Sequence, residues 1–202
     1  MIRFDRSDAL WTATLDRPEK ANSLTLDMLT DLADFATEAK GKAKVFVLTG
    51  TGKVFSAGAD LDMVRAGLAT SDVWERLSGA IADLPCLTIA ALNGTLAGGA
   101  FGMTLACDLR IAVPDARFFY PVMKLGFLPQ PSDPRRLAAL VGPSRAKLIL
   151  MAGQKITAPD ALEMGLIDRI VQRDALVDTI GELSADALSA TPSHVAGIKA
   201  LI

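Results

Sequence analysis

The chain has 202 residues, of which 50% are hydrophobic and 22% charged, and its 21 basic and 23 acidic side chains leave a formal net charge of −2. This length fits one domain with a substantial core, and the balanced charge argues against broad electrostatic binding to nucleic acid. The N-terminal segment is too charged for a signal peptide, and Asn93 and several glycines interrupt the most apolar stretch, so neither a leader nor a membrane span is expected. Cys86 and Cys107 lack metal-ligand spacing; we expect two buried thiols, no metal and a cytoplasmic protein.

Hydrophobic periodicity and turn residues predict alternating strands and helices along the whole chain. Strands are expected at 2–6, 9–15, 44–49, 87–92 and 109–113, with a short extended piece at 117–119. Helices are expected at 25–40, 61–67, 72–83, 98–106, 158–165 and 174–189, and the chain from residue 132 onward is expected to be mostly helical. We expect Ser23 or Thr25 to cap the first helix. The alternation indicates an α/β fold.

One pattern occurs twice: a buried strand ends in a glycine-containing loop, and a helix begins there. It reads VFVLTG…SAGADLDM in the first copy and TIAALNG…AGGAFGM in the second. If the two loops are neighbours, the free N–H groups of two helix starts converge on one point. Such a point suits an oxyanion better than a metal, and its chemistry comes from the backbone.

Five ordered stretches carry a family resemblance: LDRPEKANSLT (15–25), VFVLTGTGKVFSAGADLDM (45–63), PCLTIAALNGTLAGGAFGMTLACDLRIA (85–112), LGFLP (125–129) and RRLAALVGPSRAKLILMAGQKITAPDALEMGLIDRIV (135–171). With them the chain resembles the enoyl-CoA hydratase/isomerase (crotonase) family. The resemblance implies an α/β spiral of ββα units, of the ClpP/crotonase kind. Residues 1–172 would form the spiral core, and residues 173–202 a C-terminal helical segment shorter than that of relatives.

The resemblance also implies the chemistry. Family members bind an acyl-CoA thioester and stabilise its enolate or oxyanion with two backbone N–H groups, which correspond to Ala59 and Gly99 in this sequence. Because the donors are main-chain groups, alanine at Gly99 would keep the donor, whereas proline there would delete it. Coenzyme A would enter as part of the substrate, with no other cofactor. The expected assembly is a homotrimer or a pair of trimers, and the expected setting is fatty acid metabolism, by lyase or isomerase chemistry.

Residues that match the coenzyme A site of relatives lie in two loops. They are Lys20, Ala21, Ser23, Ala57, Asp60 and Leu61. For Lys20 the alternative is a solvated surface lysine. Asp60 is expected to order its loop by accepting backbone N–H bonds rather than to exchange protons.

The sequence departs from the hydratases of this family at both catalytic glutamates, whose positions hold Gly102 and Val122. Neither residue exchanges protons, and general acid–base help is worth roughly 10²–10⁴ in rate per group. We therefore expect little or no conventional hydration, and favour a variant reaction such as decarboxylation, which forms the enolate without a base. The alternative is an inert acyl-CoA-binding protein.

Two side chains are candidates to replace the missing carboxylates. Asp133 is the first, with helix capping beside Pro134 as its alternative. Tyr120 is the second, with core packing as its alternative. His194, the single histidine, is expected at the surface. The apolar residues expected to line the acyl pocket are Met63, Leu68, Met103, Val122, Leu125 and Phe127.

Overall fold

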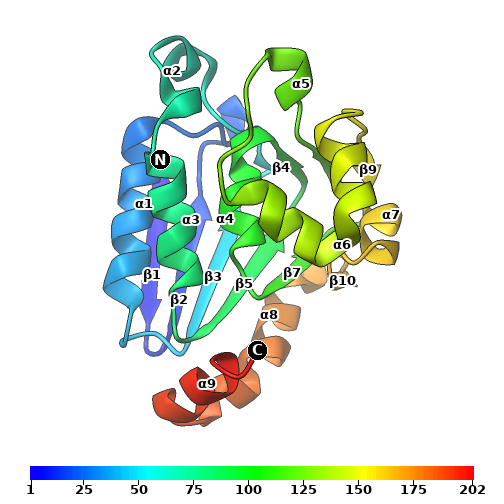
Figure 1. The fold of residues 1–202 in the computed structure, drawn as a ribbon. Coiled ribbons are helices and arrows are strands. Elements are labelled where there is room, and N and C mark those ends of the chain that lie inside the picture. The colour runs from blue at the N-terminus through cyan, green and yellow to red at the C-terminus, as the bar shows by residue number, and fades with distance from the viewer.

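Two sheets with mostly parallel strands form the frame of the molecule (Figure 1). The computed structural model describes residues 1–202. The six-stranded sheet contains, in spatial order, β1 (Ile2–Ser7), β2 (Leu10–Leu15), β3 (Val45–Gly50), β5 (Leu87–Leu92), β7 (Leu109–Ala112) and β10 (Arg169–Ile170). The four-stranded sheet contains β4 (Val54–Ser56), β6 (Thr95–Ala97), β8 (Arg117–Phe119) and β9 (Ile156–Thr157). Only the β1–β2 and β8–β9 pairs are antiparallel.

The chain alternates between the two sheets. After β3, β5 and β7 in the large sheet, it enters β4, β6 and β8 in the small one, and each time a helix follows. This repetition confirms the expected α/β spiral of ββα units. The sequence did not reveal four short strands. Residues of β4 and β6 were expected to be loop and turn, and those of β9 and β10 lie in the part of the chain expected to be mostly helical. Two or three residues are too few for a periodic pattern.

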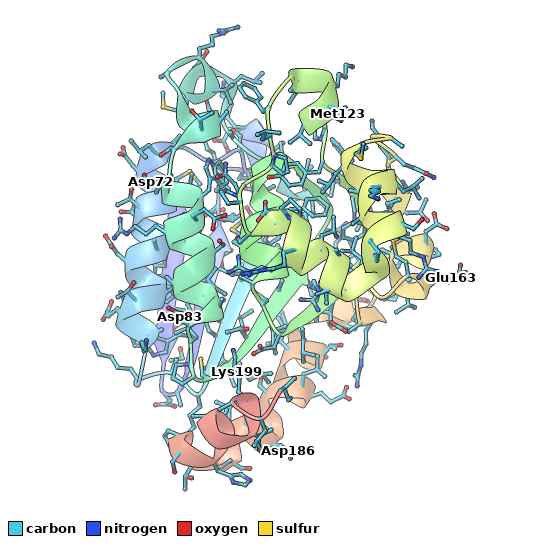
Figure 2. The ribbon with its side chains drawn as sticks, in the orientation of Figure 1. Asp72, Asp83, Met123, Glu163, Asp186 and Lys199 are labelled. Atoms are coloured by element: carbon cyan, nitrogen blue, oxygen red, sulfur yellow. The ribbon has the colours of Figure 1, made fainter.

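The expected helices are all present, and one short helix was missed. The helices are α1 (Leu26–Ala39), α2 (Leu61–Arg65), α3 (Val73–Ala82), α4 (Phe101–Leu105), α5 (Val122–Leu125), α6 (Asp133–Leu150), α7 (Ala158–Glu163), α8 (Leu176–Ser189) and α9 (Pro192–Lys199). Thr25 caps α1 by accepting the Met28 N–H at 3.3 Å. Helix α5 is the one that was missed. Helices α2 and α5 project from one end of the molecule (Figure 1), and Met123 on α5 is 61% exposed (Figure 2). None of the helices is long and apolar enough to cross a membrane.

Both faces of the central strands β3, β5 and β7 are buried, as parallel strands require, whereas the edge strand β1 is largely exposed. In β3, Phe46 and Leu48 belong to the main core, whereas Val45 and Val47 belong to a second cluster that includes Leu176 of α8. Helix α9 lies below the strands, at the end of the molecule opposite α2 and α5 (Figure 1), and its Lys199 donates to the Cys86 carbonyl and pairs with Asp108 at 2.8 Å. Cys86 and Cys107 are buried and free, and burial raises the pKa of their thiols to about 11 and about 12.

The turn between β5 and β6 passes against the backbone that enters β4. A Cβ at Gly94 would lie 2.0 Å from the Lys53 carbonyl oxygen, so Gly94→Ala forces the two backbones apart. We expect this change to lower the free energy of unfolding by about 1–3 kcal/mol or more, measured by urea denaturation. The control is Gly181→Ala inside α8, where a Cβ meets nothing within 4 Å. That change should stabilise the protein by about 0.5–1 kcal/mol, and equal effects of the two changes would contradict the packing argument.

Candidate active site

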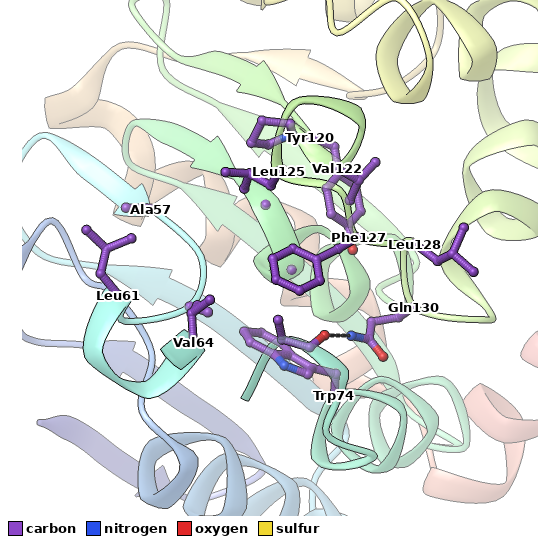
Figure 3. Close-up of a pocket in the computed structure, with 15 residues that line it drawn as sticks. Ala57, Leu61, Val64, Trp74, Tyr120, Val122, Leu125, Phe127, Leu128 and Gln130 are labelled. Atoms are coloured by element: carbon purple, nitrogen blue, oxygen red, sulfur yellow. Dashed lines mark hydrogen bonds between the residues drawn. The ribbon is translucent and has the colours of Figure 1, made fainter. Parts of the chain in front are cut away.

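A cavity of about 170 Å³ lies between the two projecting helices and the start of α4 (Figure 3). Trp74 and Gln130 lie on one side of it, Tyr120 and Val122 on the other, and Leu61 and Val64 of α2 on a third. No charged side chain lines it. The lining residues are Ala57, Ala59, Leu61, Val64, Ala69, Trp74, Gly98, Gly99, Tyr120, Pro121, Val122, Leu125, Phe127, Leu128 and Gln130.

The main-chain N–H of Ala59 is left free by the way its loop pairs with the segment before α1. Leu24 donates its N–H to the Gly58 carbonyl at 2.8 Å, and its own carbonyl accepts the Asp60 N–H at 2.9 Å. Since successive peptide groups of an extended segment face opposite sides, the Ala59 N–H points away from Leu24. It has no hydrogen-bond partner within the chain, and Ala59 lines the cavity.

The second glycine loop lies directly against the first, because β4 and β6 are parallel neighbours. Gly58 and Gly98 both have positive φ, +89° and +58°, and a Cβ at Gly58 would lie 2.9 Å from the Ala97 carbonyl oxygen. The same Cβ would be 3.4 Å from the Gly99 nitrogen, which belongs to the first turn of the helical segment leading into α4. Amides in such a turn have no partner inside the helix. Two main-chain donors therefore border one cavity, an arrangement that can bind an anionic oxygen.

Gly99 is more constrained than the sequence suggested. A Cβ there would lie 3.2–3.3 Å from the ring of Trp74, closer than an ordinary van der Waals contact. Alanine at Gly99 would keep the N–H, as expected, but its methyl group would press on an aromatic wall of the cavity. The indole N–H is held by the Leu68 carbonyl at 2.8 Å, which leaves the ring little freedom to move away.

The segment before α1 is hydrogen-bonded to the first glycine loop. Ala21 has a φ of +51° and its carbonyl accepts the Ala57 N–H at 3.0 Å. Lys20 is exposed and its side chain makes no hydrogen bond or ion pair within the chain. Of the residues expected at the coenzyme A site, Leu61, which is 76% exposed, and Ala57 line the cavity, whereas Lys20, Ala21, Ser23 and Asp60 do not.

Asp60 orders the loop, as its sequence context predicted. Its Oδ1 accepts the Asp62 N–H at 3.1 Å and caps α2, while its Oδ2 pairs with Arg17 at 2.7 Å and accepts the Ser23 hydroxyl at 3.3 Å. The Arg17 guanidinium holds the pKa of the Asp60 carboxyl below its usual value. Arg17 lies within the first of the five family-like stretches, but no local pattern in the sequence marks it as a partner of Asp60.

Tyr120 and Asp133 are brought together beside the cavity. The Tyr120 ring lines the cavity, is 4% exposed and stacks on Phe101, and its hydroxyl donates to Asp133 Oδ2 at 2.9 Å. The helix-capping alternative for Asp133 is wrong: α6 begins at this residue, Ser132 is the N-cap, and no side chain caps the helix. The carboxyl instead turns inward, where it is the partner that the buried tyrosine hydroxyl requires.

Burial changes the acidity of both groups. It raises the pKa of the Asp133 carboxyl to about 7, and the nearby charge of Glu75 acts in the same direction. The hydrogen bond from Tyr120 opposes this shift and does not cancel it. The pKa of the Tyr120 hydroxyl is raised above its ordinary value by burial first and then by the adjacent Asp133 charge.

Position 102 is tied to Asp133 by packing. Gly102 is buried in α4, and a Cβ on it would lie 2.8 Å from Asp133 Oδ1. The Asp133 carboxyl thus occupies the space into which a side chain at 102 would project. Val122 lines the cavity and provides no ionisable group there.

The apolar lining was predicted in part. Val122, Leu125 and Phe127 line the cavity, but Met63, Leu68 and Met103 do not. Leu68 and Met103 are packed into the main core, which sequence alone cannot distinguish from a pocket wall. Trp74 and Leu128 were missed because nothing in the sequence shows where a helix face or loop meets an opening. His194 is exposed on α9 and takes no part in this cavity, as expected.

Comparison with known proteins decides the family. The sequence profile described as "Enoyl-CoA hydratase/isomerase" matches residues 5–202. The chain belongs to the enoyl-CoA hydratase/isomerase family. Among its relatives, a protein of Mycobacterium tuberculosis named "Probable enoyl-CoA hydratase" is 36% identical over 171 residues, which cover 84% of this chain and 70% of that protein. The short-chain-enoyl-CoA hydratase of Clostridium acetobutylicum is 33% identical over 206 residues, covering 96% and 77% respectively.

Solved structures agree with this assignment. The enoyl-CoA hydratase of Bacillus anthracis superimposes with a TM-score of 0.89 at 31% identity, over 98% of this chain and 80% of that one. An enoyl-CoA hydratase from Mycobacterium avium gives 0.88 at 30% identity, over 98% and 79%. The fold of this member of the enoyl-CoA hydratase/isomerase family is therefore the crotonase fold, with the cavity between its ββα units.

The elevated pKa of Asp133 makes a prediction about stability. Between the ordinary value of 3.8 and about 7, the unfolded carboxyl is ionised while the folded one keeps its proton, so rising pH favours the unfolded state. Asp133→Asn removes this loss and retains an acceptor for Tyr120. The variant should gain about 2–3 kcal/mol relative to wild type between pH 5 and pH 8, measured by urea denaturation at both values. A difference in stability that does not change with pH would contradict the assignment.

Proposed function

We propose that this protein binds an acyl-CoA thioester and stabilises its enolate or oxyanion with the main-chain N–H groups of Ala59 and Gly99. The observation that carries the proposal is that these two free donors border one cavity. Donors fixed by the backbone need no reorganisation as charge develops on the carbonyl oxygen, and one such donor is typically worth about 10²–10³ in rate. The family membership supports a thioester as the source of that oxygen.

Coenzyme A would lie along the segment before α1 and the loop between β4 and α2. Lys20 would offer its free ammonium group to a phosphate or to the adenine, and Ala21, Ser23, Ala57, Asp60 and Leu61 would shape the groove. No resident cofactor or metal is part of this proposal. We further propose that the protein is cytoplasmic and assembles as a homotrimer or a pair of trimers, as the family resemblance implies.

The acyl group would enter an apolar space. A cavity of about 170 Å³ is close to the ~150 Å³ that holds one benzene molecule, so it accepts a short acyl or an aroyl group. Leu61 and Leu125, 76% and 59% exposed, continue the apolar surface outward. A longer fatty chain would follow that surface.

A variant reaction fits the site better than conventional hydration. Gly102 and Val122 supply no carboxylate to hold and deprotonate water, whereas decarboxylation needs only an oxyanion site and a proton donor. A 2-carboxyacyl thioester would place its carboxylate in a cavity without a charged side chain, which desolvates the reactant. The C–C bond breaks, carbon dioxide leaves, the electron pair forms the enolate at the Ala59 and Gly99 donors, and the α-carbon takes a proton from Tyr120.

A screen by mass spectrometry tests this function. Purified protein is mixed with enoyl-, 3-enoyl-, 3-hydroxyacyl-, malonyl-, methylmalonyl- and aroyl-CoA, and we expect carbon dioxide loss from a malonyl-type thioester. Gly99→Pro deletes one donor and should lower the rate by about 10²–10³. Because this variant can misfold, wild type is also tested for binding of a thioester and of its thioether analogue, which lacks the carbonyl; the thioester should bind about tenfold more tightly.

Two results would contradict the proposal. Rapid hydration of crotonyl-CoA would show that Gly102 and Val122 do not prevent hydration. Equal affinity for thioester and thioether would show that the two donors do not engage the carbonyl. The second candidate function is that of an inert acyl-CoA-binding protein, and the absence of carboxylates at positions 102 and 122 favours it. Tight binding of thioesters with no conversion of any would identify the protein as this second candidate.

A further inference from the structure

Asp133 is a buried carboxyl group with one oxygen bonded and the other free. It is 1% exposed, its Oδ2 accepts the Tyr120 hydroxyl, and its Oδ1 has no hydrogen-bond partner. Leaving a carboxylate oxygen without a partner inside a protein costs free energy, and the neutral acid avoids most of that cost. The geometry around Asp133 therefore favours a carboxyl that holds a proton.

Two charged groups lie near Asp133: the Glu75 carboxylate raises the pKa of its carboxyl and the Arg136 guanidinium lowers it, and burial outweighs both. On α3, Glu75 accepts the Ser132 N–H at 3.0 Å and the Ser132 hydroxyl at 2.9 Å, which fixes a second carboxylate nearby. On α6, the Arg136 guanidinium donates to the Ser132 hydroxyl oxygen at 2.8 Å and forms no ion pair with Asp133. Helix α4 contributes no titratable side chain, since its sequence is FGMTL. Asp133 consequently has no direct counter-ion, and its one ionisable contact is Tyr120.

The direction of the Tyr120–Asp133 hydrogen bond depends on where the proton resides. When Asp133 is ionised, the tyrosine hydroxyl donates to it and its proton is turned away from the cavity. When Asp133 is protonated, the carboxylic acid donates to the tyrosine oxygen, and the tyrosine proton is free to turn toward the cavity that the ring lines.

We propose that Asp133 is the proton reservoir of this site and delivers its proton to the substrate through Tyr120. The inference rests on the proposed function, since it needs an enolate in the cavity. The α-carbon of the enolate takes the tyrosine proton, a C–H bond forms, and the tyrosine oxygen takes the proton of Asp133. The step ends with a neutral tyrosine and an Asp133 carboxylate, which regains its proton from water.

Gly102 supports this assignment independently of acidity. Its missing side chain leaves room for the Asp133 carboxyl, since a Cβ at position 102 would lie only 2.8 Å from Oδ1. Gly102→Ala would therefore push the carboxyl away from Tyr120 without changing an ionisable group. Glycine at position 102 therefore has two consequences. It leaves the site without the glutamate that the family resemblance implies there, and it makes room for the Asp133–Tyr120 pair.

The first test needs no substrate, because the chain has one tyrosine. With [ζ-¹³C]tyrosine, the free protein gives one resonance, whose chemical shift reports whether the hydroxyl donates or accepts. We expect the shift to titrate with a midpoint near the Asp133 pKa of about 7. Asp133→Asn keeps every other titrating group, so the midpoint should vanish in that variant. A resonance that does not change between pH 5 and pH 9 would overturn the proposal.

The second test follows proton transfer to carbon. If the relay runs in reverse, Tyr120 removes an α-hydrogen of butanoyl-CoA while its own proton passes to Asp133, and in D₂O the α-hydrogens exchange for deuterium. The reverse step requires Asp133 as a carboxylate, so the exchange rate should rise with pH and level off above about 7. Asp133→Asn and Tyr120→Phe should each slow exchange by about 10²–10⁴ and abolish its pH dependence. Gly102→Ala should also slow it, whereas the remote Gly181→Ala should not.

Binding of butanoyl-CoA, measured as protection against thermal unfolding, separates the two hypotheses. If the thioester binds and the tyrosine titrates, but exchange is absent or survives in Asp133→Asn, the relay is wrong while the proposed binding function stands. If no thioester binds, the proposed function fails, and the relay that rests on it fails with it. Exchange that is lost in both pair variants, with binding retained, supports both.

Discussion

The parallel pairing of β4 with β6 is the contact on which the rest of the site depends. Each strand has three residues, yet their pairing places the loop after β4 against the loop after β6. The approach is so close that a Cβ at Gly58 would lie 2.9 Å from the Ala97 carbonyl oxygen. Glycine at this point is therefore a steric requirement, and without it the amides of Ala59 and Gly99 would not border one cavity.

The backbone supplies the proposed oxyanion site, so proton transfer is the step that depends on side chains. Along the cavity wall only Tyr120 has an ionisable side chain, and behind it the hydroxyl is bonded to Asp133. Their pairing accounts for two observations. The buried Tyr120 hydroxyl has a hydrogen-bond partner, and the Asp133 carboxyl lies where a residue larger than Gly102 would displace it. In hydratases of the family the resemblance assigns proton transfer to two glutamates. Here a carboxyl from the start of α6 occupies the space next to position 102.

The sequence was sufficient for five strands of the large sheet, for most helices and for the neighbouring glycine loops, because these features leave periodic or repeated patterns; it did not predict β10. It also indicated Asp60 as a loop-ordering group, and the interpretation of Gly102 and Val122 as replacements of family glutamates stays a prediction. It could not show that Asp133 turns inward, because a Ser-Asp-Pro sequence at a helix start is equally compatible with capping. Trp74, Arg17 and Glu75 acquire their positions from contacts between elements far apart in the chain, and no local pattern encodes such contacts.

The central claim is that the two loop amides polarise a thioester carbonyl, and infrared spectroscopy of a bound substrate tests it most directly. Acyl-CoA labelled with ¹³C at the carbonyl is added to the protein, and the isotope-edited difference spectrum isolates that one C=O stretch. Two hydrogen bonds from Ala59 and Gly99 weaken the C=O bond, so the account predicts a shift to lower frequency relative to the thioester in water. A bound thioester whose carbonyl frequency matches or exceeds that in water would contradict the account.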